Sequence, residues 1–458
     1  MSTESPSSTG RDRLLSPVTV GADATTGDAA VVDAMVSVEV ALVRAWAAVG
    51  VAPAGVAAAA GAAFGWDDAT GRCTGHGIDA ARLAASAPTT GSPVMALVRE
   101  MRAAAPAEVA PWIHRGATSQ DILDSALMIV TADGARAVRE DLGRAVAGLT
   151  RLAEAVGDAP AVARTLTQHA VPTTWALRIS RWRSGLERAA RRVENVVAQA
   201  PAQLGGAAST LAGPLEVARA EGPDEAGAHA AAAALPRALA GALGLRAPDA
   251  PWHTTRWPIT EAGDALVQAT DALAAMASDL ATLARPEIAE VRLAAGGGST
   301  AMPHKRNPVG AVLLRSAAIR APHLAASLHT SAAMAVDERS DGAWHAEWPV
   351  LQDLVGLAVG AAATAVPLVE GVSVDADRSA ATLADALPGV LSERLRISLE
   401  PRLGPERASE AIALATVQEL RAWLGAQPER ADVDIDDLLD PARATGLAVR
   451  LAQDEVRE

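Results

Sequence analysis

The chain has 458 residues and a formal net charge of −14 at neutral pH, with half of its residues hydrophobic and 21% charged. These values are typical of a soluble globular protein, and the length predicts two or three domains or one elongated helical architecture. The negative charge argues against a nucleic-acid partner. Cys73 is the one cysteine, which excludes a disulfide framework and a cysteine-based metal site, so we expect a reducing cytoplasm.

The chain begins with a polar segment that lacks the apolar stretch of a signal peptide, and we expect a flexible tail over residues 1–25. Two longer uncharged stretches follow, at residues 45–66 and 354–369. The first is mostly Ala and Gly, the second is short, and each contains a proline. We interpret both as buried helices and expect no membrane partner.

Helical signals dominate the chain, because Ala, Leu, Arg and Glu are abundant and alternating β-branched runs are nearly absent. Apolar residues at helical spacing predict long helices over residues 119–156, 173–200, 259–292 and 308–334. Helices of this length cannot bury an apolar stripe alone, so they predict an all-α fold with a long bundle, often completed by other subunits. The predicted organisation is a tail (1–25), an N-terminal helical domain (26–112), a central helical bundle (113–370) and a C-terminal helical domain (371–458).

The first polar junction reads His-Arg-Gly-Ala-Thr-Ser-Gln-Asp at residues 114–121, directly before an apolar-periodic segment. Thr118 or Ser119 is a natural N-cap there, and the free backbone amides and the helix dipole favour an anion. A capping role without any ligand is the alternative interpretation of these residues.

The second junction, residues 164–174, is a polar strip that passes through Pro172 and then opens a helix. Its side chains are therefore expected to be fixed beside a helix N-terminus. A lone histidine at such a place, here His169, is more often structural than catalytic. Two Trp-His patches, at residues 251–256 and 342–348, are candidate site segments, and packing against the bundle is the alternative interpretation of both.

The third junction is a glycine-rich loop, residues 296–308, that contains Lys305, the only lysine among 40 basic residues. A lysine kept in such an arginine-biased chain indicates a task for a compact point charge, with chance placement as the alternative. Asn307 and Pro308 suit the cap and the first position of the next helix. Ser299 is placed so that its alkoxide form is favoured. The chain has no phosphate-loop, HExxH or GxSxG motif, so we expect neither a metal site nor a hydrolase.

Residues 298–308 read Gly-Ser-Thr-Ala-Met-Pro-His-Lys-Arg-Asn-Pro, which resembles the signature loop of the fumarase/aspartase superfamily with Thr300 in place of its second serine. The junctions above match the superfamily's shared regions in the same order over nearly the whole chain. Leu166 stands where adenylosuccinate and argininosuccinate lyases carry a catalytic histidine, which argues against these two. The chain most resembles the bacterial 3-carboxy-cis,cis-muconate cycloisomerases, on residues 114–121, 164–170, 203–207, 251–254 and 344–348.

The resemblance implies an all-α fold with a long central bundle flanked by two smaller helical domains, in a homotetramer without a cofactor. Its active sites would combine segments from three subunits. The implied reaction adds a carboxylate across a double bond of 3-carboxy-cis,cis-muconate, a small polycarboxylate, and gives a γ-lactone through an aci-carboxylate intermediate.

The resemblance also implies residue roles. Ser299 would transfer a proton, and His169 would face the ligand from another subunit; these two form the implied catalytic set. Lys305 and Asn307 would hold the carboxylate that becomes the aci-anion. The full implied substrate-binding set is His114, Thr118, Ser119, Gln120, Thr165, Gln168, Arg256, Lys305 and Asn307.

Several positions depart from the family pattern. Residues 255–257 read Thr-Arg-Trp where a Gln and an Asp are usual, and residues 300–301 read Thr-Ala instead of Ser-Thr. These changes keep a second hypothesis open, a β-elimination lyase of the same superfamily that releases fumarate from an N- or nitro-substituted succinate. A non-catalytic helical scaffold is a third hypothesis, and the presence of Ser299, Lys305 and Asn307 argues against it.

Overall fold

The computed structural model describes residues 14–222, 224–294, 297–298, 302, 305–427 and 433–454. This part of the chain is mainly helical with three short two-stranded sheets, which confirms the all-α prediction. The chain divides into two compact units. Unit 1 comprises Met1–Asp141, Ala189–Asp271 and Ser316–Ala363, and unit 2 comprises Leu142–Arg188, Ala272–Arg315 and Thr364–Glu458. The boundaries of these units differ from those of the predicted domains, and the domain boundaries stay a prediction.

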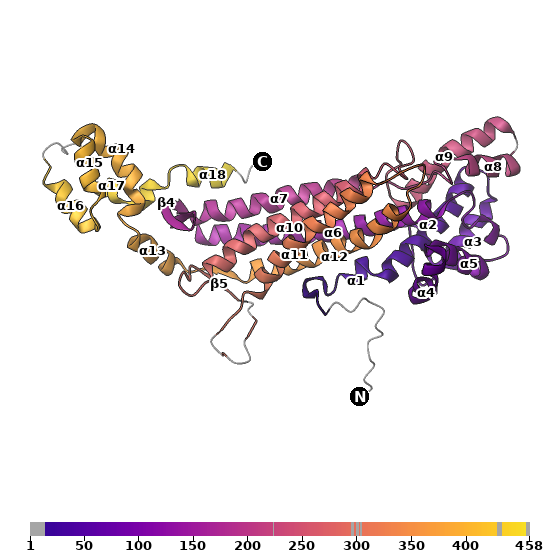
Figure 1. Ribbon diagram of the computed structural model, residues 1–458, viewed down its shortest axis with the longest axis horizontal. Coiled ribbons are helices and arrows are strands. Elements are labelled where there is room, and N and C mark those ends of the chain that lie inside the picture. The colour runs from indigo at the N-terminus through magenta and orange to yellow at the C-terminus, as the bar shows by residue number, and fades with distance from the viewer. Residues whose placement is uncertain are drawn as a thin grey trace. The chain divides into compact units, whose positions relative to one another are not determined.

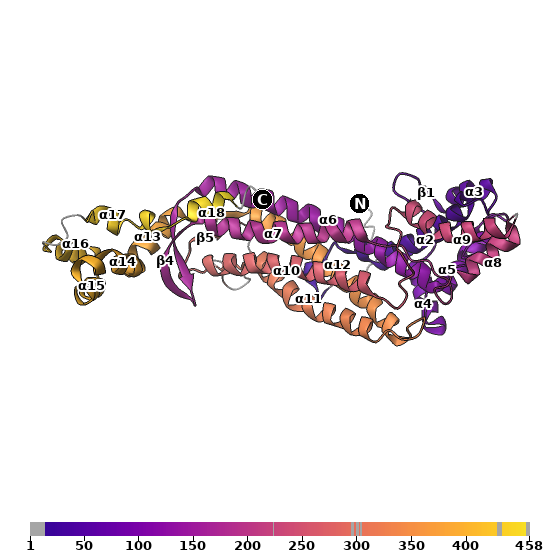
Figure 2. The same cartoon turned by 90° about the horizontal axis from the view of Figure 1, so that it is seen from above.

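Long helices contribute to both units, and within each unit they lie side by side (Figures 1 and 2). They are α6 (Ser119–Val156), α7 (Trp175–Gln199), α10 (Trp257–Leu283), α11 (Val309–Ala333) and α12 (Gly342–Glu370). The helices predicted at residues 119–156, 173–200 and 308–334 are therefore confirmed to within two residues at each end.

The helix predicted to reach residue 292 ends early, at Leu283, the last residue of α10. Pro286 lies three residues after Leu283, and the residue before a proline is disfavoured in the α region. The chain then turns and forms β5 (Val291–Leu293), which pairs with β6 (Val372–Val374) in an antiparallel sheet. The turn leaves Glu290 fully buried at the start of this sheet.

Unit 1 contains a layer of shorter helices around α2 (Asp28–Ala48), whose buried positions include Val36, Leu42 and Trp46, all 0% exposed. Aspartates cap two of these helices: Asp79 accepts hydrogen bonds at the start of α4 and Asp224 at the start of α9. The elements are α1 (Asp23–Thr26), α2 (Asp28–Ala48), α3 (Ala54–Phe64), β1 (Trp66–Asp67), β2 (Arg72–Cys73), α4 (Ala80–Thr90), α5 (Val94–Ala104), α8 (Ala212–Glu221) and α9 (Glu225–Leu243).

The N-terminal segment corrects the expectation of a flexible tail up to residue 25. From Pro17 onward the chain forms a short 3-10 helix and then α1, and it buries Val18 and Ala22. A Cβ atom added at Gly360 of α12 would lie 1.9 Å from the Val18 carbonyl oxygen. The backbone of this segment therefore packs directly on α12, which a polar N-terminal sequence does not reveal.

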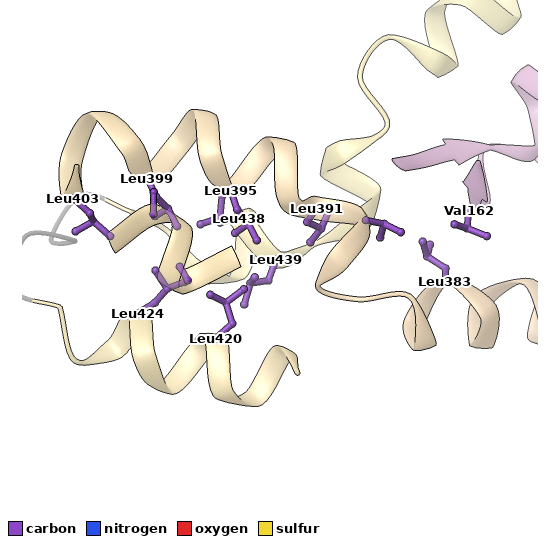
Figure 3. Close-up of a cluster of buried hydrophobic side chains, with 13 residues drawn as sticks. Val162, Leu383, Leu391, Leu395, Leu399, Leu403, Leu420, Leu424, Leu438 and Leu439 are labelled. Carbon is purple, nitrogen blue, oxygen red and sulfur yellow. The ribbon is translucent and has the colours of Figure 1, made fainter. Parts of the chain in front are cut away.

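Unit 2 has its own apolar core, built mainly by leucines of short helices near the C-terminus (Figure 3). Leu399 and Leu420 are fully buried in it, and Val162 joins the same cluster. The elements are β3 (Pro160–Thr165), β4 (Gln168–Thr174), α13 (Ala376–Asp385), α14 (Ser392–Leu403), α15 (Pro405–Ile412), α16 (Val417–Gly425), α17 (Ile435–Leu439) and α18 (Ala448–Asp454).

Among the described helices, α12 alone has the length and hydropathy of a membrane span. However, 72% of its most apolar window is buried inside the protein, as in the core helix of a globular protein. Leu354 and Ala361 in this helix are 0% exposed. The structure therefore agrees with the interpretation of residues 354–369 as a buried helix.

Two glycines of α6 provide a test of the packing between long helices. Gly134 is buried, and a Cβ atom there would lie 2.3 Å from Cγ1 of Val355, whose branched side chain has little rotamer freedom in a helix. We expect Gly134→Ala to lower the free energy of unfolding by about 1–3 kcal/mol. Gly143 on the same helix is exposed with open space around it, so Gly143→Ala should raise stability by about 0.5–1 kcal/mol. Urea denaturation of both variants measures the contrast, and equal effects would contradict it.

Candidate active site

The carboxylate of Asp121, in the first turn of α6, is the centre of the site in unit 1. It is 0% exposed and accepts hydrogen bonds from the backbone amides of Thr118 (2.9 Å), Gly205 (2.8 Å) and Gly206 (3.0 Å). The Nε2 atom of His253 lies 2.8 Å from the same carboxylate. The bond to the Thr118 amide is half of a capping box, which supports the predicted cap at the start of α6. Asp121 therefore joins three segments that are far apart in the sequence.

Gln120 lies behind this junction rather than at the surface. Its side chain is fully buried, and its Nε2 donates to the carbonyl of His253 over 2.9 Å. Its Oε1 is also buried and accepts a hydrogen bond from no residue that the structure describes. Ser119, the first residue of α6, is half-buried.

Asp124, one turn further along α6, forms a second buried cluster around the guanidinium of Arg256. Arg256 donates to Asp124 over 2.7 and 3.0 Å and also to Glu347, while Trp344 Nε1 donates to Asp124 over 2.9 Å. Burial lowers the pKa of Arg256, but the two carboxylates outweigh this effect and raise it above its ordinary value. Burial also raises the pKa of Glu347, to about 7, against the opposing effect of Arg256. The guanidinium thus serves two carboxylates of its own chain.

Arg339 is the guanidinium that the structure offers beside Thr118. Its Nη2 donates to the Thr118 hydroxyl and, over 3.2 Å, to the carbonyl of Ala207. Unlike Arg256, it is exposed. An exposed arginine next to a helix N-terminus and a threonine hydroxyl is suited to binding a carboxylate or another planar anion.

His114 stands on the same approach to α6, in a left-handed backbone conformation (φ 60°). The buried Glu39 carboxylate accepts a hydrogen bond from the backbone amide of His114 over 2.8 Å and lies 2.7 Å from Nδ1 of the His114 ring. Burial lowers the pKa of His114, but Glu39 outweighs it, and the pKa lies above its ordinary value. The imidazole is therefore biased towards its charged form at the edge of the site.

In unit 2, the second predicted junction forms an antiparallel hairpin of β3 and β4, which the sequence did not predict. Thr165 pairs with Gln168, so Leu166 and Thr167 make a two-residue turn, and both have positive φ (48° and 71°). Such turns prefer Gly, Asn or Asp, and a left-handed leucine that is 96% exposed is unusual. The turn presents the exposed side chains of Thr165, Gln168 and His169. Backbone strain of this kind clusters at functional sites.

A buried ion pair anchors this hairpin to the segment that leads into the lysine loop. Arg164 of β3 donates to the fully buried Glu290 over 2.5 and 3.1 Å, and Arg178 of α7 lies 3.9 Å from the same carboxylate. The backbone carbonyl of Glu290 accepts a hydrogen bond from the backbone amide of Asp375, the residue after β6. The hairpin and the start of β5 are thereby fixed to each other within unit 2.

The lysine loop is closed at its base by two backbone hydrogen bonds between Gly297 and Asn307, of 3.0 and 2.9 Å. Lys305 is exposed inside this closed loop, and its amide donates to the carbonyl of Met302 over 3.0 Å. Ser299, the predicted proton-transfer residue, lies outside the described residues. A pocket of about 460 Å³ beside Asn307 is lined by three arginines, and they are Arg292, Arg306 and Arg378.

Comparison with known proteins shows which family the chain belongs to. A family model described as Lyase matches residues 22–322. The chain belongs to this lyase family. It is 42% identical to a nitrosuccinate lyase of Streptomyces davaonensis, over 95% of the chain and 92% of that protein. It is 36% identical to a 3-carboxy-cis,cis-muconate cycloisomerase of Bradyrhizobium diazoefficiens, over 92% of both chains.

A solved structure agrees with the fold of this lyase-family chain. The structure of 3-carboxy-cis,cis-muconate lactonizing enzyme from Pseudomonas putida has a TM-score of 0.83 and 32% identity, and the match covers 97% of this chain and 98% of that one. The predicted membership of the fumarase/aspartase superfamily is confirmed, and with it an enzyme of the lyase type.

In this lyase-family chain the predicted site residues fall into two groups. Unit 1 holds His114, Thr118, Ser119, Gln120 and Arg256 around Asp121 and Asp124. Unit 2 holds Thr165, Gln168 and His169 on the hairpin, and Lys305 and Asn307 in the loop. Contact of any of these residues with a substrate stays a prediction.

The structure pairs Arg256 with the buried carboxylates of Asp124 and Glu347, and its predicted contact with a substrate anion stays a prediction. Sequence reasoning did not single out Arg339, which takes the exposed position instead, nor Asp121 as the organising residue. Asp121 lies three residues after the predicted cap, Thr118, and this capping-box spacing could have identified it from the sequence. Within the described residues, no group of three His, Cys, Asp or Glu is placed to hold a metal ion.

The His114–Glu39 pair predicts a pH-dependent stability in this lyase-family chain. Because the folded-state pKa of His114 is raised, the pair stabilises the fold fully below the unfolded-state pKa and loses this contribution as pH rises through the folded-state pKa. Glu39→Gln should therefore lower the free energy of unfolding by about 1–3 kcal/mol near pH 6 and by less near pH 9.

The half-exposed pair of His329 and Asp264, at 3.0 Å, provides the matched control. Exposed pairs contribute little, so Asp264→Asn should change stability by less than about 1 kcal/mol at both pH values. Denaturant unfolding at the two pH values measures both variants. A Glu39→Gln effect that is the same at both would contradict the assignment.

Proposed function

We propose that this protein catalyses β-elimination from a nitro-substituted succinate, releasing nitrite and fumarate. The observation that carries the proposal is the 42% identity to a nitrosuccinate lyase over 95% of the chain, against 36% to a cycloisomerase. The reaction balances without a cofactor: a base removes the proton beside one carboxylate, the carbon–nitrogen bond breaks, and nitrite leaves with its electron pair. The double bond of fumarate forms between the two carbons.

The chemistry needs positive groups and hydrogen-bond donors around three anionic or nitro groups. Removing the proton creates an aci-carboxylate, whose charge must be stabilised by preorganised donors. In our proposal, Lys305 and Asn307 hold this group, and Ser299 takes the proton. Arg339 and Thr118 bind the second carboxylate, as their contact beside the start of α6 supports. Nitrite is a weak base, so its departure demands little help from a general acid.

The proposal includes a homotetramer in which residues of unit 1 from one subunit meet the hairpin and the lysine loop of others. Two observations support it. The hairpin turn exposes Leu166 almost completely in a strained conformation, which a partner surface would cover. Helix α11 exposes Val312 (52%) and Ile319 (69%), apolar side chains of the kind that a helical bundle buries between subunits.

A second candidate function is cycloisomerisation of 3-carboxy-cis,cis-muconate to a γ-lactone. The structural match to the lactonizing enzyme of Pseudomonas putida, with a TM-score of 0.83, favours it. Both reactions proceed through an aci-carboxylate, so the same lysine, serine and threonine serve either one. They differ in whether a group leaves or an internal carboxylate adds.

The deciding experiment incubates the purified protein with nitrosuccinate and, separately, with 3-carboxy-cis,cis-muconate. We expect equal amounts of nitrite and fumarate from the first substrate, measured by a colorimetric nitrite assay and by chromatography. The second substrate is followed by loss of its diene absorbance. Rapid loss of the diene without any release of nitrite would replace elimination with the cycloisomerase function.

The role of Lys305 gives a prediction for whichever substrate is turned over. Lys305→Arg keeps the charge but replaces a compact ammonium by a planar fork, so kcat/KM should fall by about two orders of magnitude. Arg306→Lys, at the exposed neighbouring position, makes the reverse exchange and should stay near wild type. Steady-state kinetics of both variants tests this, and near-normal kinetics of Lys305→Arg would remove the lysine from the mechanism.

A further inference from the structure

Ser209 lies in the loop that joins Gly205 and Gly206 to α8, and it is held in an unusual way. Its backbone is left-handed (φ 60°), a conformation that costs a residue with a side chain more than it costs glycine. Its hydroxyl lies 2.7 Å from Nδ1 of His253 and remains partly exposed. A serine in a conformation suited to glycine, with its hydroxyl tied to a buried imidazole, indicates a use for that hydroxyl.

The imidazole of His253 is itself fixed on its other side. It is 1% exposed, and its Nε2 lies 2.8 Å from the Asp121 carboxylate. A carboxylate only accepts, so Nε2 carries a proton. The loop packs tightly on the ring, since a Cβ atom at Gly205 would lie 2.9 Å from Cε1 of His253. Ser209, His253 and Asp121 therefore form one hydrogen-bonded row from the surface to the buried carboxylate.

This row ends beside the cationic part of the site. Arg339 donates to the carbonyl of Ala207, two residues before Ser209, and to the hydroxyl of Thr118. The carboxylate of Asp121 also binds the amide of Thr118, so one group positions both the threonine and the serine. The partly exposed hydroxyl of Ser209 is thus carried on the same short loop that Arg339 contacts.

We propose that Ser209 is a substrate-binding residue whose hydroxyl donates a hydrogen bond to the anionic group held by Arg339 and Thr118. His253 and Asp121 are the positioning residues that hold this hydroxyl in place. The proposal rests on the elimination of a nitro-substituted succinate described above and adds a specificity-determining contact to it. Binding an anion uses the hydroxyl hydrogen, and the hydroxyl oxygen of Ser209 then accepts a hydrogen bond from Nδ1 of His253. Among the residues that the structure describes, the charged side chains hydrogen-bonded to His253 are Asp121, at Nε2, and Arg256, 3.4 Å from the backbone carbonyl.

The test compares Ser209→Gly and Ser209→Ala with wild type in the full-length protein. Both should raise KM for nitrosuccinate about tenfold to a hundredfold, the effect of losing one hydrogen bond to a charged group, and change kcat less. Ser209→Gly also relieves the left-handed strain, so its Tm should equal or exceed that of wild type. A structural role predicts the reverse pattern, a lowered Tm with KM unchanged. Thr210→Ala removes the neighbouring hydroxyl, which accepts a hydrogen bond from the Ala212 amide, and is the matched control.

A second pair of variants tests the positioning role of His253. His253→Gln places an amide near the former Nε2 and keeps a partner for Asp121, but it cannot reach Ser209. In that background Ser209→Gly should have little further effect on KM, so the two changes should be far from additive. Full additivity would overturn the proposal that His253 orients the hydroxyl.

Binding of a non-reactive probe separates this inference from the proposed reaction. Ethane-1,1,2-tricarboxylate carries a carboxylate in place of the nitro group, and calorimetry gives its Kd for wild type and Ser209→Gly. We expect binding to wild type that weakens at least tenfold in the variant. Equal affinity, or no binding to wild type, would overturn the role of Ser209. If no nitrite is released while the Ser209-dependent binding persists, the proposed reaction fails and the binding site stands.

Discussion

The buried carboxylate of Asp121 is the constraint on which the arrangement in unit 1 depends. It accepts hydrogen bonds from three backbone amides and lies next to His253. It therefore holds together the start of α6, the turn at Gly205 and the Trp-His patch of residues 251–256. Removing the carboxylate would leave buried amides without partners, at a cost of about 1–3 kcal/mol each. Apolar packing alone would hold these segments together without fixing their register. The carboxylate supplies that register, and Thr118 and Ser209 take their positions from it.

The two units use the same device in different places. Arg256 lies between Asp124 and Glu347 in unit 1, and Glu290 lies between Arg164 and Arg178 in unit 2. Buried ion pairs of this kind are weak evidence for net stability, because desolvation offsets much of the attraction. Breaking one partner is costly, however, which makes the geometry specific.

The sequence predicted the helices well because their apolar periodicity extends over many turns, and α6 begins and ends at the predicted residues. It missed the β3–β4 hairpin because Leu166 and Thr167 are not turn-forming residues, and only the folded backbone shows their positive φ. It singled out Lys305 because that lysine has no equal in the chain. Arg339 is one of many arginines, and nothing in its local sequence separates it from Arg256. Burial and partners make that distinction, and both are properties of tertiary structure.

An acidic protein that binds a polyanion has to keep some cationic groups free of its own carboxylates. In the described part of the chain, several cations of the candidate segments in each unit are paired internally: His114 with Glu39 and Arg256 with two carboxylates in unit 1, and Arg164 with Glu290 in unit 2. Arg339 and Lys305 differ, because the former contacts a hydroxyl and a carbonyl and the latter is exposed in its loop. Neutral oxygens hold Arg339 in place without neutralising its charge. Its charge therefore remains available, and in the proposed reaction an anion bound beside Arg339 would meet donors that need no rearrangement.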